Sequence, residues 1–304
     1  MQRRHFIKQT AAASALLAAG SFGLSAFSAN PKRKHITILH TNDTHSRLDP
    51  FPANDARYAN KGGVARRATL IENIRKENPN TLLLDAGDFF QGTPYFNFYG
   101  GELELKFMSM LKYDAATIGN HEFDNGVEGL LAPLHQANFP LVSSNYDFSN
   151  TVMDGFVKKY ITLKKDGIKI GIFGLGVELE GLVTKKLYQE TKYYDPIEVA
   201  QDMTGILKEE EQCDLIICLS HLGYSYEHDK VSDIKVAEAT RNIDLIIGGH
   251  THTFLPKPVI VKNIDNEEVL INQVGFAGIN LGRIDFYFEE KNEMNSQSRV
   301  IEVF

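Results

Sequence analysis

The chain is a succession of short apolar runs and longer segments in which apolar positions recur at helical spacing. Apolar side chains alternate along residues 35–40, and a second apolar run occupies 81–86, so both segments predict strands. Between them, residues 64–77 have the apolar spacing of a helix that ends before Pro79. The same criteria predict further strands at 115–118, 139–143, 160–164, 168–175, 215–219, 244–247, 259–262, 269–274 and 281–289, and further helices at 102–111, 127–137, 196–211 and 232–239.

Local signals mark the boundaries of several of these elements. Residues 41–61 are rich in proline and asparagine and predict a long loop. Asp195 followed by Pro196 is typical of a helix N-cap with proline at the first helical position. Strand–helix units come first, and hairpins with antiparallel pairing follow, which predicts two packed sheets flanked by helices in one α/β (α+β) domain. In the helix at 102–111 we expect the inward side chains to be Leu103, Phe107, Met110 and Leu111.

The first 28 residues have the character of an export signal. Arg3 and Arg4 lie in a segment close to a twin-arginine motif, and an apolar run at 10–24 is followed by the small residues Ala26 and Ser28. A membrane anchor is the alternative, but this run is short and rich in alanine and glycine, whereas a span needs about 20 strongly apolar residues. We therefore expect a signal peptide at 1–28, a catalytic domain at 29–304, a periplasmic location and no stable membrane anchor.

Charge and cysteine content narrow the function classes. The formal net charge is −7, and removal of Arg3, Arg4 and Lys8 with the signal would take it to −10. An acidic chain argues against binding to nucleic-acid polymers or anionic membranes. Cys213 and Cys218 are five positions apart around one strand-like run, about 16 Å if extended, which is too far for a disulfide. We expect two buried thiols.

Several predicted strands run directly into acidic, amide or imidazole side chains. Asp43 and His45 follow the first strand two positions apart, so both can reach one ion. Asp88 follows the second strand, and its two oxygens can bridge two cations, although a turn or N-cap aspartate is the plainer interpretation. Asn120 follows the third strand and offers a neutral carbonyl oxygen, or else serves a tight turn after Gly119.

Histidines follow two later strands. His221 ends one apolar run, where a lone histidine is more often a hydrogen-bonded core residue. His250 and His252 share a glycine-rich loop, and two imidazoles there rarely pack for their own sake. Taken together, these side chains predict two nitrogen-and-oxygen metal sites around a shared carboxylate. We expect His40 to orient one of the ligands. The remaining candidates, His35, His135 and His228, are expected to be structural or solvated.

Seven motifs in order along the chain carry a family resemblance. Together they are highly specific and span residues 39 to 254. The chain resembles the metallophosphatase domain of 5′-nucleotidases, within the calcineurin-like metallophosphoesterase superfamily. The motifs are LHTNDTHSR at 39–47, GGVAR at 62–66, LDAGD at 84–88, QGT at 91–93, GNHEFDNG at 119–126, SSN at 143–145 and GHTHTF at 249–254.

The resemblance implies a four-layer αββα sandwich and a role for each candidate. His121 and Asp124 would be the catalytic dyad, with a third metal ligand as the alternative for His121. Arg47 would orient phosphate or a ligating aspartate, or else form a surface ion pair. His252 departs from the pattern, because 5′-nucleotidases usually carry glutamine or asparagine there. The ligands would be Asp43, His45, Asp88 and His252 for one metal, and Asp88, Asn120, His221 and His250 for the other.

The resemblance also implies the reaction. Two divalent cations (Zn, Mn, Fe or Co) would activate water to release phosphate from a nucleotide, with Asn120, His121 and Arg47 contacting the substrate. The alternatives are a phosphatase, a cyclic phosphodiesterase or a sulfur-ester hydrolase acting on another small anion, and a non-catalytic metal-binding subunit of a split nucleotidase. Full-length relatives carry a C-terminal nucleotide-binding domain, which we expect a separately encoded partner to supply.

Overall fold

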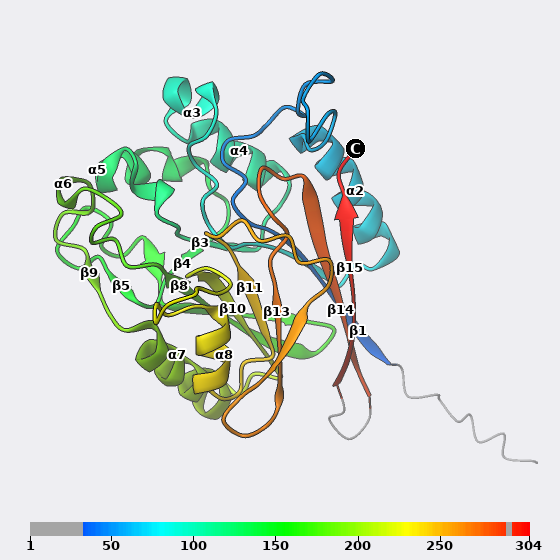
Figure 1. The fold of residues 1–304 in the computed structure, drawn as a ribbon. Coiled ribbons are helices and arrows are strands. Elements are labelled where there is room, and N and C mark those ends of the chain that lie inside the picture. The colour runs from blue at the N-terminus through cyan, green and yellow to red at the C-terminus, as the bar shows by residue number, and fades with distance from the viewer. Residues whose placement is uncertain (1–32, 290–293) are drawn as a thin grey trace, which may run out of the picture.

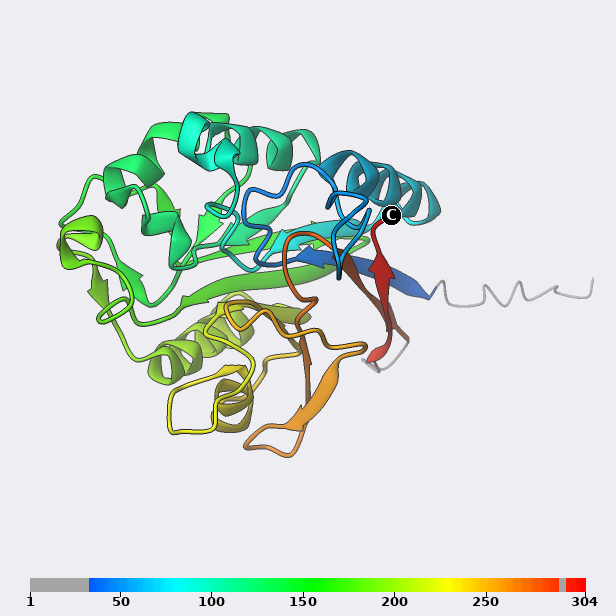
Figure 2. The ribbon, with the colours of Figure 1, turned by 45° about the horizontal axis from the view of Figure 1, so that its top comes forward.

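Two β-sheets lie face to face in the middle of the molecule, and helices cover the outer face of each (Figures 1 and 2). The computed structural model describes residues 33–289 and 294–304; the expected signal segment lies outside them. The first sheet has the strand order β15-β14-β1-β2-β3-β4-β6 and the second β12-β13-β11-β10-β8-β7. A small ribbon of β5 and β9 lies apart from both. This is the expected four-layer αββα arrangement.

The bounds of the elements are as follows. The first sheet contains β1 (Lys34–Thr41), β2 (Thr81–Asp85), β3 (Ala115–Thr117), β4 (Leu141–Val142), β6 (Val157–Lys158), β14 (Asn280–Phe288) and β15 (Met294–Glu302). The second contains β7 (Tyr160–Lys165), β8 (Ile168–Gly176), β10 (Leu215–His221), β11 (Leu245–Gly248), β12 (Val259–Lys262) and β13 (Glu268–Asn272), and the ribbon contains β5 (Tyr146–Asp147) and β9 (Lys192–Tyr193). The helices are α2 (Val64–Glu77), α3 (Pro94–Tyr99), α4 (Glu102–Met110), α5 (Gly126–Leu131), α6 (Lys185–Tyr188), α7 (Pro196–Gly205) and α8 (Asp233–Ala239), with 3₁₀ turns at His121–Phe123 and Ala132–Gln136 and a π turn at Ile206–Glu210.

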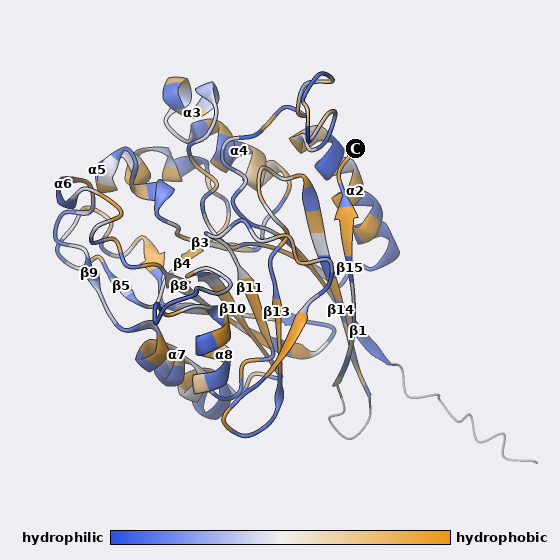
Figure 3. Ribbon diagram, in the orientation of Figure 1, coloured by the Kyte–Doolittle hydropathy of each residue, from blue (hydrophilic) through white to orange (hydrophobic). Residues whose placement is uncertain are grey.

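Alternation along the strands divides the core into three apolar layers. On β10, Leu215, Ile217 and Leu219 point between the sheets, whereas Ile216 and Cys218 point toward α7 and α8. The first sheet follows the same rule, with one face of β1 and β2 in the layer between the sheets and the other against α2 and α4. Figure 3 shows the hydrophobic colour concentrated on the central strands. Both faces of each sheet are therefore covered, as parallel strands require.

Aspartates placed just before three strands tie neighbouring strands together. Each carboxylate accepts a 2.8 Å hydrogen bond from a backbone N–H near the start of the next strand, which would otherwise lack a partner. These bonds fix the relative heights of parallel strands at the edge opposite the loops that carry the candidate ligands. The pairs are Asp114 with Leu83, Asp214 with Lys169, and Asp244 with Ile216.

Most predicted elements are present, and the differences are informative. The prediction of antiparallel C-terminal strands is correct for β12 with β13 and for β14 with β1, but β13 pairs in parallel with β11. Helix α4 buries Glu104, Leu105 and Met108, so the expected inward face was wrong, and Met110 is 66% exposed. The reason is that the Glu104 carboxylate accepts a buried hydrogen bond from Ser46, which a hydrophobic pattern does not reveal.

The cysteine prediction is confirmed, because Cys213 and Cys218 are free thiols and both are buried. The capping prediction is also confirmed, since the Asp195 side chain accepts the N–H groups of Ile197 and Glu198 at the start of α7. Within residues 33–289 and 294–304, no helix combines the length and apolar character that crossing a bilayer demands.

Candidate metal centre

The predicted ligands come together at one edge of the two sheets. Strands β1, β2 and β3 run parallel, as do β10 and β11, so their carboxyl ends open onto shared edges where ligands usually bind. The first sheet contributes side chains from three loops and the second from two. Those from the first sheet are Asp43, His45, Asp88, Asn120 and His121, and those from the second are His221, His250 and His252.

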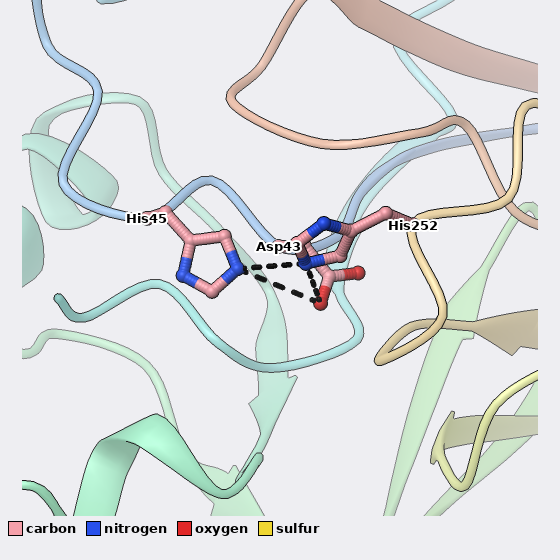
Figure 4. Close-up of side chains that lie close together, drawn as sticks. All are labelled: Asp43, His45 and His252. Carbon is pink, nitrogen blue, oxygen red and sulfur yellow. Dashed lines mark hydrogen bonds and ion pairs between the residues drawn. The ribbon is translucent and has the colours of Figure 1, made fainter. Parts of the chain in front are cut away.

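Asp43, His45 and His252 form the first cluster (Figure 4). The Nε2 atoms of His45 and His252 are 2.9 Å apart, and the Oδ1 atom of Asp43 lies 3.9 Å and 3.4 Å from them respectively. Asp43 is fully buried, and its carboxylate also accepts the backbone N–H of His250. Two imidazole nitrogens and one carboxylate oxygen thus converge on a single point.

Asp88, His221 and His250 form the second cluster. The Nε2 atom of His221 lies 2.9 Å from Oδ2 of Asp88, and Nδ1 of His250 lies 2.8 Å from Oδ1 of Asn120. Asp88 also lies in a group with His45. The Asp88 carboxylate is therefore placed between the two clusters, where a bridging ligand would be.

The hydrogen bonds made by the far sides of two imidazoles fit metal binding. Nδ1 of His45 lies 3.2 Å from the carbonyl oxygen of Phe90, and Nδ1 of His221 lies 2.7 Å from that of Ala86. A carbonyl can only accept, so each Nδ1 carries a proton, and in the neutral ring Nε2 keeps its lone pair. The Nε2 atom of His221 is buried without a hydrogen-bond partner. A histidine ligand held in this way is typical of metal sites.

The candidate loops have unusual backbone conformations. Five of the predicted ligands have positive φ angles, between 48° and 70°. Left-handed backbone is uncommon for residues other than glycine, and it persists only where the surroundings impose it. Because the same conformation recurs at the ends of three strands, the loops place these side chains at a cost in local stability. The five are Asp43, His45, Asp88, His250 and His252.

The electrostatics of the second cluster is that of a pair awaiting a cation. Burial alone would lower the pKa of His221, but Asp88 and Asp43 raise it to about 10. Burial would raise the pKa of Asp88, but the neighbouring imidazoles hold it well below its usual value. Burial lowers the pKa of His250 to about 4, which leaves this ring neutral and able to ligate. A bound cation would take the place of the proton on His221.

His121 and Asp124 lie beside the clusters as a pair. Nδ1 of His121 is 2.9 Å from Oδ2 of Asp124, and this hydrogen bond is the largest cause that raises the pKa of His121 to about 9. The backbone N–H of His121 donates to Oδ1 of Asp88 at 2.8 Å. His121 also falls within ligand distance of His45 and Asp88, so geometry alone admits both a proton donor and a third ligand.

A pocket of about 290 Å³ opens over the first cluster. His45, His121 and His252 line it on one side, and Arg47 and Phe276 line it on another. The half-buried Arg47 places its guanidinium 4.3 Å from the centre of the Phe51 ring, and no ion pair involves it among the residues described. Arg47 thus lies at the pocket wall, in reach of an anion, which disfavours the alternative of a surface ion pair.

His40 does not have the expected role. Its ring is fully buried, burial lowers its pKa to about 3, and Nε2 lies 3.0 Å from the Asn272 side-chain amide. A Cβ added to Gly282 would clash with the ring, so His40 fills the space beside β14. The prediction that it orients a ligand was wrong, because the side chain of β1 at this position faces away from the loops.

Glu122 is a site residue that sequence analysis missed. Its carboxylate is buried and accepts the backbone N–H groups of Asp88, Phe90 and Gly119. Burial and the nearby Asp88 raise its pKa to about 8. It thereby joins the loop after β2 to the loop after β3. The available signal was its place between His121 and Asp124 in one short turn.

Gln273 and Asn42 hold the other loops. The Gln273 side chain donates to the carbonyl of Gly249 and accepts from Thr251, so it supports the loop that bears His250 and His252. Asn42 donates to Asp43 and to the carbonyl of Gly275, each at 2.6 Å. Neither residue was predicted, because a polar residue at a strand end gives no sign of which loop it contacts.

Comparison with known proteins agrees with this geometry. A family model described as calcineurin-like phosphoesterase matches residues 36–254. The chain is 37% identical over 300 residues to the trifunctional nucleotide phosphoesterase protein YfkN of Bacillus subtilis (strain 168), which covers 88% of this chain and 19% of that protein. It is 35% identical over 302 residues to the snake venom 5′-nucleotidase of Crotalus adamanteus, covering 93% and 48% respectively.

A solved structure shows the same fold. The 5′-nucleotidase precursor from Thermus thermophilus superposes with a TM-score of 0.81 at 33% identity, over 89% of this chain and 55% of that one. The chain therefore spans about half the length of two of these relatives, and less of the third.

Proposed function

Because the chain belongs to the calcineurin-like phosphoesterase family, we propose that it is a metal-dependent phosphohydrolase that releases phosphate from nucleotides. The observation that carries the proposal is the position of Asp88 between two clusters of candidate ligands. Nucleotide hydrolysis is favoured over other phosphoesters because the relatives named above are described as nucleotide phosphoesterases or 5′-nucleotidases.

The proposed metals are divalent cations held by the seven predicted ligands. When bound there, such cations supply Lewis-acid activation of water and neutralise charge on phosphoryl oxygens. The donor set of imidazole nitrogens and carboxylate and amide oxygens admits Zn, Mn, Fe or Co. The proposal gives Asp43, His45, Asp88 and His252 to one ion, and Asp88, Asn120, His221 and His250 to the other.

The proposed task of His121 is to protonate the leaving oxygen of the ester. The Asp124 carboxylate accepts from Nδ1 and so fixes the ring with Nε2 free to face the substrate. A pKa of about 9 keeps the ring protonated at neutral pH, as an acid must be before it donates. Arg47 is proposed to bind a phosphoryl oxygen, since it lines the same pocket as His121.

A substrate panel tests the function. Purified, metal-analysed protein should hydrolyse AMP, while UDP-glucose and 2′,3′-cyclic AMP decide between a narrow 5′-nucleotidase and a broader nucleotide phosphohydrolase. Glycerol 2-phosphate and a thiosulfonate ester would reveal the alternative anions. Failure on all three nucleotides with metal present removes the nucleotide assignment, and failure on every ester favours the non-catalytic subunit.

The remaining predictions concern the whole protein. We propose that residues 1–28 direct export by the twin-arginine route, that 29–304 form the catalytic domain, and that the enzyme works in the periplasm. The Thermus relative is itself described as a precursor. N-terminal sequencing of protein from a periplasmic fraction tests all three. We propose further that a separate nucleotide-binding chain acts with this domain, which copurification would reveal.

A further inference from the structure

A second pocket, of about 430 Å³, adjoins the one over the metal centre. The two pockets share the side chain of Arg47, which lies between them. The second is lined by α3 on one side and by the loop that follows His45 on the other. Figure 1 shows α3 standing out from the body of the molecule. A substrate whose phosphoryl group contacts Arg47 would therefore have its leaving group directed toward this space.

The walls of the second pocket are aromatic and largely uncharged. Tyr95, Phe98 and Tyr99 contribute rings, and Phe98 and Tyr99 are 82% and 50% exposed. Apolar rings exposed side by side have no role in folding and are typical of binding sites. The charged side chains in the lining are Arg47 and Asp49, and Asp49 accepts a hydrogen bond from Tyr95. Such a lining suits an uncharged planar ring better than a further phosphate.

The pocket is held in place relative to the metal centre. The Tyr95 hydroxyl donates to Oδ2 of Asp49 at 2.7 Å, and the Thr93 hydroxyl donates to the carbonyl oxygen of Ser46 at 2.8 Å. Both bonds join α3 to the loop that carries His45 and Arg47. The two pockets are thus fixed to each other, which reduces the cost of ordering a bound ligand.

We propose that this second pocket binds the nucleobase of a nucleoside monophosphate, with Phe98 and Tyr99 as stacking faces. The inference rests on the proposed function and names the part of the substrate that this domain itself recognises. Aromatic stacking tolerates every base, so the pocket would favour nucleotides over aliphatic phosphoesters without selecting one base strongly. Its volume lies within the range of small-molecule sites.

Nucleoside binding tests the proposal without catalysis. Adenosine should bind saturably to chelator-treated protein by isothermal calorimetry, and D-ribose should not compete. The F98A/Y99A double variant should weaken adenosine binding about tenfold. Phe156→Ala is the matched control, since Phe156 is also exposed and lines neither pocket. Unchanged adenosine affinity in the double variant would overturn the subsite.

Kinetics give an independent readout. F98A/Y99A should raise KM for AMP about tenfold and leave KM for glycerol 2-phosphate unchanged. Equal changes for both substrates would overturn the subsite, as would a loss of dimer mass with unaltered AMP kinetics, because the rings would then be covered by a second copy. If the wild-type protein hydrolyses no ester yet binds adenosine through Phe98 and Tyr99, the proposed function fails and the subsite stands.

Discussion

The carboxylate of Glu122 accepts the backbone N–H of Asp88 in a 2.9 Å hydrogen bond. The same carboxylate oxygen also accepts the N–H of Gly119, so a single buried group sets the spacing of the loops after β2 and β3. Asp88 is the residue placed between the two ligand clusters, and its position therefore depends on Glu122.

Replacing Glu122 with Gln should weaken metal binding about 10- to 100-fold, as loss of outer support usually does. An amide can offer only one acceptor oxygen, so its NH₂ group would face a backbone N–H. Metal titration by calorimetry measures the effect. Asp244→Asn is the control for neutralising an acid away from the loops, and equal metal affinity in both variants would contradict the positioning role.

Replacing His121 with Ala should lower kcat about 10²- to 10⁴-fold, the usual contribution of a general acid. Asp124→Asn should lower kcat less, because the ring keeps a hydrogen-bond partner of similar shape. Elemental analysis should still find two metals per chain in both variants. A loss of one metal together with the activity would show that His121 is a ligand instead.

Replacing Asp88 with Ala should abolish binding of at least one metal, because Asp88 belongs to two of the ligand groups. Ligands that bind the folded state raise its stability by mass action, so added Mn²⁺ or Zn²⁺ should raise the Tm of the wild type. The Tm of the variant should respond much less. Equal responses, measured by scanning calorimetry with and without chelator, would place the metals elsewhere.

Gly119→Ala should disrupt the centre although only a methyl group is added. A Cβ there would overlap Oδ1 of Asp88 and lie 2.7 Å from Nε2 of His221, which no real contact tolerates. Metal affinity and kcat should fall together. Gly205→Ala is the matched control, because nothing lies within 4 Å of its added Cβ and alanine favours a helix by about 0.5–1 kcal/mol. Unchanged metal affinity in Gly119→Ala would contradict this geometry.

Asp244 should make stability fall as pH rises. Burial raises its pKa from 3.8 to about 6 in the folded chain, so the folded state keeps a proton that the unfolded state releases. The free energy of unfolding should therefore decrease from about pH 4 to pH 6 by about 1–2 kcal/mol. Asp244→Asn retains an acceptor for the N–H of Ile216 and should lack this decrease. Chelator-treated proteins, unfolded in urea at each pH, provide the measurement, and parallel curves would contradict it.

Apolar spacing predicted the regular core of this fold because the inner strands are buried on both faces. It failed where burial and polarity disagree. Strand β15 was missed because its sequence is mostly polar and it pairs only at the edge of its sheet. Helix α3 was missed because its aromatic residues are exposed, and α4 was turned the wrong way because it buries Glu104.

The ligand candidates were found because they share one position, just after a buried strand. Residues that support them have no such regularity. Glu122 acts through backbone amides of two loops, and Gln273 reaches a loop more than 20 positions away, so only the folded chain shows what they contact. His40 was misplaced for the opposite reason, since it is near the loop in sequence but faces the body of the sheet.

Strand β1 lies between β2 and β14, and its partner on the β14 side comes about 250 positions later in the chain. A ribosome therefore produces β1 almost at the beginning and the strand that completes its hydrogen bonds almost at the end. During synthesis, one side of β1 offers unpaired N–H and C=O groups to any passing strand. Pairing across so long a separation is slow. A nascent chain of this kind depends on a chaperone to shield that edge until β14 emerges.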